Sequence, residues 1–154
     1  LWGQGPSADD LLDVVRDRGG VADPVMRERL VDLYIESQIL RLIRLRTVTA
    51  AIKGTEPGPE ASIRKVLADE HGQHIMSAAK DLAGAGGMLA DVGPLGAPAD
   101  FWHHGYLFAP ALTIGGGTGD VQRNIVAERV LGLPHDIDVE EGRTWAEARR
   151  AAPG

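Results

Sequence analysis

The stretch LTIGGGTGDVQRNIVAERVLGLP, which runs from Leu112 to Pro134, places three consecutive glycines directly before a helical pattern. The spacing of its apolar residues predicts an amphipathic helix over Thr118–Leu131, and the glycine and proline that follow are typical of a helix end. Because glycine has no side chain, the segment 115–117 would let a ligand approach the backbone closely. The stretch therefore predicts a last helix that is preceded by a loop of three glycines.

This glycine loop has two interpretations on its residues alone. A helix that begins at Thr118 has unpaired N–H groups and the positive end of its dipole there, and both favour a phosphate group. A tight turn capped by the Thr118 side chain explains the same residues without a ligand. The loop lacks the Gly-Lys-Ser/Thr of a Walker A motif, and no strand precedes it as in a dinucleotide-binding turn.

Two long helices are predicted upstream of the loop. Asp23-Pro24 forms a helix start, and apolar residues then recur mostly every three or four positions as far as Lys53, where a glycine follows. This helix would contain about 30 residues and span ~45 Å. A second pattern covers Pro59–Leu82 and ends at a glycine cluster. Two long antiparallel helices, with the last helix packed on them, indicate an all-α bundle.

The remaining segments are predicted to be short or irregular. Ser7 is expected to cap a short helix that ends at Gly19-Gly20, and Phe101–Tyr106 is expected to form another. The segment Gly93–Ala99, rich in proline and glycine, is predicted to be an irregular connection. No alternation typical of strands occurs.

We expect three parts in the chain, with one domain that has a sizeable core. Residues 1–22 form an N-terminal loop and short helix, residues 23–134 form the helical domain, and residues 135–154 form a tail that is mobile or docked on a partner. The tail is rich in Asp, Glu, Arg and Ala.

The composition excludes several classes of partner. The net charge of −6 argues against nucleic acid, because phosphate neutralisation needs clustered basic residues, and Arg41, Arg44 and Arg46 are interleaved with Leu and Ile. The chain has no cysteine, which removes disulfides and thiolate metal ligands and favours an intracellular location. No apolar run approaches the roughly 20 residues that span a bilayer. We therefore expect a cytoplasmic protein with no nucleic-acid partner and no membrane partner.

A metal site is not expected at the histidines. His71 and His74 lie three residues apart on one predicted helix, with Asp69 and Glu70 beside them. A di-metal carboxylate bundle needs Glu-x-x-His motifs on two helices, and no glutamate stands three residues before either histidine. We interpret both as surface or interface histidines.

Two motifs resemble one protein family. Residues 116–132, GGTGDVQRNIVAERVLG, are similar to the last helix of the acyl-CoA dehydrogenase family, whose pattern ends in Ala-Glu-Arg-x-Leu-Gly. Residues 81–87, DLAGAGG, resemble the Gly-Gly-x-Gly turn that precedes this helix in the family, with Ala85 in place of one glycine. The long helix from Asp23 and the Pro-Gly-Pro-Glu restart are similar to actinobacterial members that handle bulky acyl chains.

The resemblance implies a fold, a cofactor and partners. The implied fold is the C-terminal four-helix-bundle-like domain of the family, without its first helix. In the family this domain mediates oligomerisation and touches FAD. The complete enzyme is a flavoprotein of lipid metabolism and fatty acid β-oxidation that introduces an α,β double bond into an acyl-CoA. Thr118 and Asp120 would contact FAD, and the turn with Asp81, Gly84 and Ala85 would meet the cofactor of an adjacent chain. Asp120 is explained equally well as an acid that pairs with the helix dipole.

The sequence departs from the family at the catalytic base. Many members carry a glutamate immediately before Gly-Thr, and here Gly116 occupies that position. Other members carry the base on the first helix of this domain, and the chain is expected to start after that helix. No catalytic residue is therefore predicted in this chain.

Three hypotheses remain for the function. The chain is the C-terminal domain of an acyl-CoA dehydrogenase, the non-catalytic subunit of a heteromeric dehydrogenase, or a helical interaction module without activity. We expect the isolated chain to self-associate through the face that carries Leu33 and Ile43. We expect the protein to work as a homo- or hetero-oligomer. We also expect it to bind FAD weakly or not at all, and to oxidise no acyl-CoA by itself.

Overall fold

The computed structural model describes residues 6–55, 58–89, 99–135 and 142–147, and in these ranges the regular structure is helical, with no strand. In chain order the elements are α1 (Ala8–Asp17), α2 (Pro24–Ile52), α3 (Glu60–Ala83), the 3-10 helix η1 (Gly84–Met88), α4 (Ala99–Leu112), α5 (Gly119–Ile125) and the π-helix η2 (Val126–Val130). The predicted all-α fold class is confirmed. Most of the predicted connection 93–99 and of the predicted tail 135–154 lies outside the described residues. Among the described helices, none combines the length and the apolarity of a membrane span.

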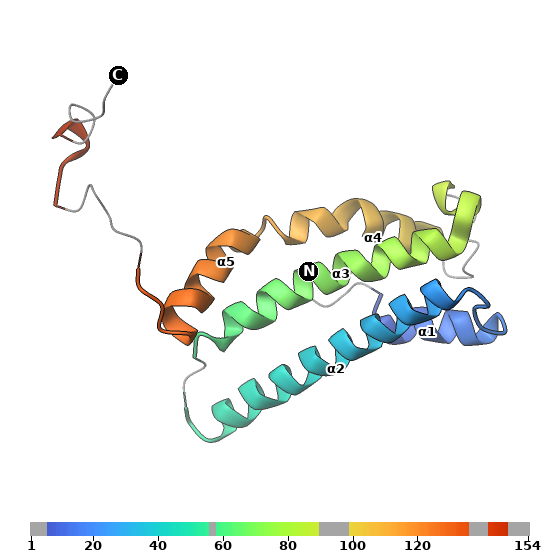
Figure 1. The fold of residues 1–154 in the computed structure, drawn as a ribbon, viewed down its shortest axis with the longest axis horizontal. Coiled ribbons are helices and arrows are strands. Elements are labelled where there is room, and N and C mark those ends of the chain that lie inside the picture. The colour runs from blue at the N-terminus through green and yellow to red at the C-terminus, as the bar shows by residue number, and fades with distance from the viewer. Residues whose placement is uncertain (1–5, 56–57, 90–98, 136–141, 148–154) are drawn as a thin grey trace.

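The fold is built on the antiparallel pair α2 and α3, which lie side by side in Figure 1. Asp23 accepts a hydrogen bond from Val25 N at 3.1 Å, and Pro24 occupies the first turn of α2, as predicted. The helix ends at Ile52, one residue before the predicted end, and Gly54 follows with φ +72°. The buried core lies between the helices and includes Leu11, Leu30, Leu33, Ile75, Met76, Ala79, Trp102 and Ala109.

Ser7 caps α1 as predicted. Its Oγ accepts a hydrogen bond from Asp10 N at 3.2 Å, and Ser7 N donates to Asp10 Oδ2 at 2.7 Å, so the two residues form a capping box. The hydrogen bonds from Ser7 hold the pKa of the Asp10 carboxyl below its ordinary value. α1 packs against both α2 and α3.

Helix α4 extends beyond the predicted segment Phe101–Tyr106 at both ends, and both Gly105 and Pro110 lie inside it. A Cβ atom on Gly105 would lie 2.6 Å from Met76 Sδ, so this glycine permits close packing of α4 on α3. Pro110 lies in the last turn, where the hydroxyl and the N–H of Thr113 both donate to its carbonyl oxygen. The prediction was too short because the helix continues past Tyr106, with Pro110 tolerated in its last turn.

The last helix begins where predicted, with Thr118 as its cap. After Ile125 the α-helix widens into the π-helix η2, which ends at Val130. In Figure 1 this segment lies along α3 on the side away from α2. It therefore packs mainly on one of the two long helices, whereas the sequence predicted packing on both.

The predicted self-association face is wrong in part. Leu33 is 2% exposed and belongs to the core, so it cannot present an apolar surface to a partner. Five of the exposed apolar residues of α2 recur at intervals of three, four or seven positions, which places them along one side of the helix: Val31, Ile35, Leu42, Leu45 and Ile52. We call these five residues the α2 stripe.

Candidate functional site

The glycine loop joins α4 to α5 and folds back on the first turn of α5. Gly116 and Gly117 have φ values of +71° and +96°, in the left-handed region that favours glycine. Gln122 Nε2 donates a hydrogen bond to Gly116 O at 3.1 Å, and a Cβ atom on Gly117 would lie 2.6 Å from the same Nε2. The two glycines are therefore required by the turn itself.

Thr118 and Asp120 both lie at the exposed start of α5. Thr118 Oγ1 accepts a hydrogen bond from Val121 N at 3.4 Å, and none of the described residues accepts the hydroxyl hydrogen. The Asp120 side chain is 95% exposed, and its Oδ1 lies 3.7 Å from Arg123 Nη1. The Thr118 hydroxyl can donate and the Asp120 carboxylate can accept, so together they can hold a ligand that has both kinds of polar group.

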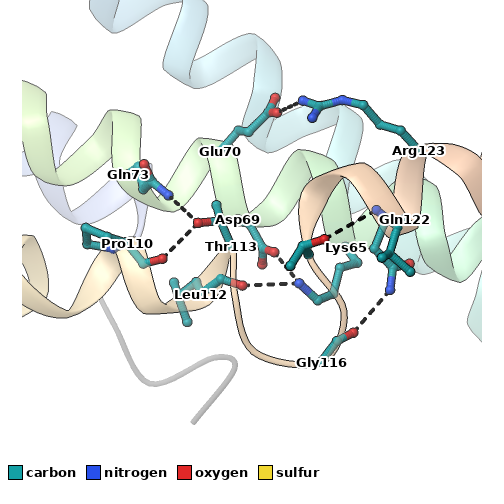
Figure 2. A network of polar contacts seen from close by, with 12 residues as sticks. Lys65, Asp69, Glu70, Gln73, Pro110, Leu112, Thr113, Gly116, Gln122 and Arg123 are labelled. Carbon is teal, nitrogen blue, oxygen red and sulfur yellow. Dashed lines mark hydrogen bonds and ion pairs between the residues drawn. The ribbon is translucent and has the colours of Figure 1, made fainter. Parts of the chain in front are cut away.

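Polar contacts fix both sides of the loop to α3, as Figure 2 shows. On the α4 side, Lys65 Nζ donates to Leu112 O at 3.1 Å and forms an ion pair with Asp69, whose side chain is almost fully buried. On the α5 side, Arg123 forms an ion pair with Glu70. The loop is thus anchored at its entry and at its exit.

The second predicted site, with Asp81, Gly84 and Ala85, lies at the other end of α3. The Asp81 carboxylate forms an ion pair with Arg29 of α2, while Ala85 is exposed in η1. Gly84 ends α3 with φ +57°, and a Cβ atom there would meet nothing within 4 Å. Asp81 follows Glu70 by eleven residues, or roughly 16 Å along the helix. The two predicted sets of cofactor residues are therefore not brought together within one chain.

A groove of about 1000 Å³ lies between α2, α3 and α4, with the start of α1 among its lining residues. Its apolar lining includes Ile75, Met76, Phe108 and Leu112, and its polar lining includes the cations Arg41, Arg44, Arg64 and Lys65. Gly116 lines it as well. Cations from two helices thus line the groove, together with the acids Asp9 and Asp69. Spacing within a single helix could not reveal a cluster that forms between helices.

His71 and His74 link α3 to α2. Both contact the Glu36 carboxylate, at 2.7 Å from His71 Nδ1 and at 3.3 Å from His74 Nδ1. In the part of the chain that the structure describes, no group of three or more His, Cys, Asp or Glu residues is arranged to hold a metal ion. Both histidines therefore lie at the interface between α2 and α3 within this chain.

Comparison with known proteins identifies the family. The family model described as "Acyl-CoA dehydrogenase, C-terminal domain" matches residues 9–131. The chain belongs to the acyl-CoA dehydrogenase family. The match extends from α1 through η2, so it includes the motif at residues 81–87 and all but the last residue of the motif at 116–132.

The curated relatives are longer acyl-CoA dehydrogenases from mycobacteria. The chain is 34% identical over 128 residues to acyl-CoA dehydrogenase IpdE1 of Mycolicibacterium smegmatis, an alignment that covers 83% of this chain and 30% of the relative. It is 30% identical over 130 residues to acyl-CoA dehydrogenase FadE34 of Mycobacterium tuberculosis, covering 84% of this chain and 17% of the relative. The chain spans less than a third of the length of these relatives.

Two solved structures share the fold. The steroid acyl-CoA dehydrogenase Tcur3481-Tcur3483 superposes with a TM-score of 0.70 at 22% identity, covering 84% of this chain and 34% of the matched chain. The ChsE4-ChsE5 complex from Mycobacterium tuberculosis superposes with a TM-score of 0.65 at 24% identity, covering 86% of this chain and 37% of the matched chain. The helical arrangement of this chain is therefore that of acyl-CoA dehydrogenases.

Proposed function

We propose that this chain acts as the C-terminal domain of an FAD-dependent acyl-CoA dehydrogenase and contributes cofactor contacts and a subunit interface, but not the catalytic base. Such an enzyme introduces an α,β double bond into an acyl-CoA, with FAD as the acceptor of the hydrogen removed as hydride. The chain spans less than a third of the curated relatives it matches. The remaining flavin contacts, the acyl-CoA site and the base would come from other domains or subunits.

The observation that carries this proposal is the position and the backbone conformation of Gly116. It stands immediately before Gly117-Thr118, where many family members have the glutamate that abstracts the α-proton, and its φ of +71° is one that a glutamate rarely adopts. A non-glycine residue in this region costs about 1–2 kcal/mol. The loop therefore has no carboxylate at this point and has a backbone that suits glycine.

The nearest acid after the loop does not replace this glutamate. Asp120 lies in the first turn of α5 with its side chain turned to solvent and toward Arg123. A general base must reach the substrate proton within hydrogen-bond distance. Asp120 is better suited to accept a hydrogen bond from FAD, next to a Thr118 hydroxyl that can donate one.

The residues present fit a polar cofactor at two places. At the glycine loop, the exposed Thr118 hydroxyl stands beside a backbone without side chains at 115–117. At the far end of α3, the turn Asp81–Ala85 is exposed at Asp81, Gly84 and Ala85, and it would meet the FAD of an adjacent chain. The separation of the two places along α3 supports contacts to two different FAD molecules.

The α2 stripe supports the subunit interface. Its five apolar side chains are between 48% and 81% exposed, and they extend over most of α2. An apolar strip of this length on one helix is typical of a surface that another chain covers. The heteromeric alternative is favoured by a specific observation, because both solved relatives bear names that join two polypeptides, Tcur3481-Tcur3483 and ChsE4-ChsE5. In that case the partner subunit supplies the carboxylate that Gly116 lacks.

Bound flavin tests the proposal. The chain is co-expressed with the acyl-CoA dehydrogenase polypeptides of its own organism, and FAD per purified complex is measured by absorbance. Thr118→Ala should lower FAD content or raise the FAD dissociation constant by about fivefold, since one hydrogen bond contributes about 1 kcal/mol. Thr49→Ala is the control, because the hydrogen bond of the Thr49 hydroxyl within the described residues goes to Leu45 O of its own helix. Equal flavin binding by both variants, or failure to co-purify with any dehydrogenase polypeptide, would contradict the proposal.

A further inference from the structure

The glycine loop depends on other parts of the chain for its position. Residues 115–117 carry no side chains, so their placement rests on backbone groups and on the residues at the two ends of the loop. Gly115 N donates to Ala111 O at 3.0 Å, and Gly116 O accepts from Gln122 Nε2 at 3.1 Å. These bonds fold the loop onto α4 and α5, while its position over α3 depends on contacts that α3 supplies.

Lys65 of α3 holds the start of the loop. Its Nζ donates to Leu112 O, the carbonyl oxygen of the last residue of α4, at 3.1 Å (Figure 2). The last carbonyl groups of a helix have no partner within that helix. Leu112 O therefore takes its donor from α3, at the point where the chain leaves α4 for the glycines.

Asp69 acts on the loop through Lys65. The two side chains form an ion pair one helical turn apart, and the Asp69 carboxylate is almost fully buried. A lysine side chain has a long flexible stem that loses much rotational freedom when it is fixed in one place. The buried carboxylate fixes the Lys65 ammonium on the side of α3 where it reaches Leu112 O.

The other contacts between the loop region and α3 are weaker. Gln73 Nε2 donates to Thr113 Oγ1 at 3.4 Å, which is long for a hydrogen bond. Arg123 and Glu70 form an ion pair whose side chains are about half exposed, and exposed pairs contribute little. Of the described contacts to α3, the buried one through Lys65 therefore contributes most to the position of the loop.

We propose that Lys65, held by Asp69, is a positioning residue for the FAD contact at the glycine loop. The inference rests on the proposed function, in which FAD meets Thr118 and the bare backbone before it. Leu112 precedes Thr118 by six residues, so a displaced Leu112 moves the glycine backbone between them. Lys65 contacts the backbone of the loop region, and its effect on FAD passes through that backbone.

The first test needs no FAD. Amide hydrogen exchange of the full chain is followed by mass spectrometry on peptides that cover residues 113–125. Lys65→Met keeps the length of the side chain and removes its donors. Leu33→Ala is the matched control, because it weakens the core at a fully buried residue of α2. The two variants are compared at urea concentrations that give them equal free energies of unfolding.

At equal stability, the loop peptide should exchange at least about threefold faster in Lys65→Met than in Leu33→Ala. The reason is that local opening of the loop adds to the global unfolding that both variants share. Equal exchange in the two variants would overturn the proposal, since it would show that Lys65 contributes to stability without holding the loop.

The second test measures the FAD dissociation constant of the co-expressed complex. Lys65→Met should raise this constant at least about threefold, and Leu33→Ala should leave it unchanged. Lys65→Arg should recover most of the affinity, because a guanidinium group can donate both to Asp69 and to Leu112 O. Equal constants in Lys65→Met and Leu33→Ala, or no recovery in Lys65→Arg, would overturn the positioning role.

The two proposals fail in different ways. Unchanged flavin binding in Thr118→Ala contradicts the proposed function, and the positioning role for FAD fails with it. Weaker flavin binding in Thr118→Ala together with unchanged binding in Lys65→Met overturns the positioning role alone.

Discussion

The two ends of α3 hold the same kinds of residue in opposite ways. At the glycine-loop end, Lys65 is paired with the buried carboxylate of Asp69 and ties α4 to α3. At the other end, Lys80 contacts the Gly87 carbonyl and the His103 ring, and the Asp81 carboxylate forms an exposed pair with Arg29. The contacts at the first end hold the loop on α3, while at the second end Asp81, Gly84 and Ala85 are exposed. The two lysines therefore differ in their partners, because Lys65 is paired with a buried carboxylate and the described contacts of Lys80 are with a carbonyl and a ring.

The largest effect is expected from breaking the buried pair. Asp69→Asn leaves the Lys65 ammonium without its carboxylate, in a place where the two side chains are only 16% and 4% exposed. Removing one partner of a buried ion pair costs about 3–5 kcal/mol, and we expect a loss near the lower end of this range in urea unfolding.

The matched control lies at the other end of α3. Asp81→Asn breaks the pair with Arg29. The Arg29 side chain is 36% exposed and the Asp81 side chain is 55% exposed. Exposed pairs contribute at most about 1 kcal/mol, so the free energy of unfolding should change little. Equal losses in the two variants would show that the two ends do not differ as described.

Replacing a glycine should also cost more stability at the glycine-loop end of α3, at Gly117, than at the other end, at Gly84. Gly117→Ala adds a side chain at φ +96°, and its Cβ would displace Gln122 from its bond to Gly116 O. The strain and the lost hydrogen bond together should cost about 2–3 kcal/mol. Gly84→Ala at φ +57° meets no atom within 4 Å, so only the strain remains, at about 1–2 kcal/mol. Thermal unfolding of both variants measures the difference, and a smaller cost for Gly117→Ala would contradict the structure of the loop.

Much of this fold follows from local sequence signals. The start of α2 at Asp23-Pro24 and its end near Gly54 were predictable, because capping, a proline in the first turn and a glycine stop act within a few residues. Thr118 was predictable as a cap for the same reason. The close approach of α4 to α3 at Gly105 was not predictable, because it depends on Met76 of another helix.

Features that form between helices were not predictable from the sequence. The apolar residues of α2 lie on more than one side, so periodicity could not show that Leu33 faces the core while Leu42 stays exposed. The cations of the groove come from α2 and α3, and only packing brings them together. At the candidate site, Thr118 and Gly116 were found through the motif. The contact between Lys80 of α3 and His103 of α4 has no local signature in the sequence.

A contact inside α1 gives the smallest effect and depends on pH. Ser7→Ala removes the cap and should cost about 1 kcal/mol at neutral pH. Ser7 holds the pKa of Asp10 below 3.8, so this contribution is present above pH 3.8 and is lost as the pH falls through the folded-state pKa. Urea unfolding should therefore show a smaller gap between Ser7→Ala and the unmodified chain at about pH 3 than at pH 7. Ser37→Ala, which removes a neutral hydrogen bond to Tyr34 O, should show no such change.

The central claim is that this domain holds FAD at the glycine loop without supplying the base. The most direct measurement is dye reduction by the co-expressed complex with acyl-CoA, comparing the unmodified chain with Asp120→Asn, the variant of the acid nearest to Gly116-Gly117-Thr118 in the sequence. A general base contributes about 10²–10⁴-fold to a rate, whereas one cofactor contact contributes far less. We expect turnover to fall by less than about tenfold once FAD is saturating. A loss of about 10³-fold or more with FAD still bound would show that Asp120 is the base, and would contradict the claim.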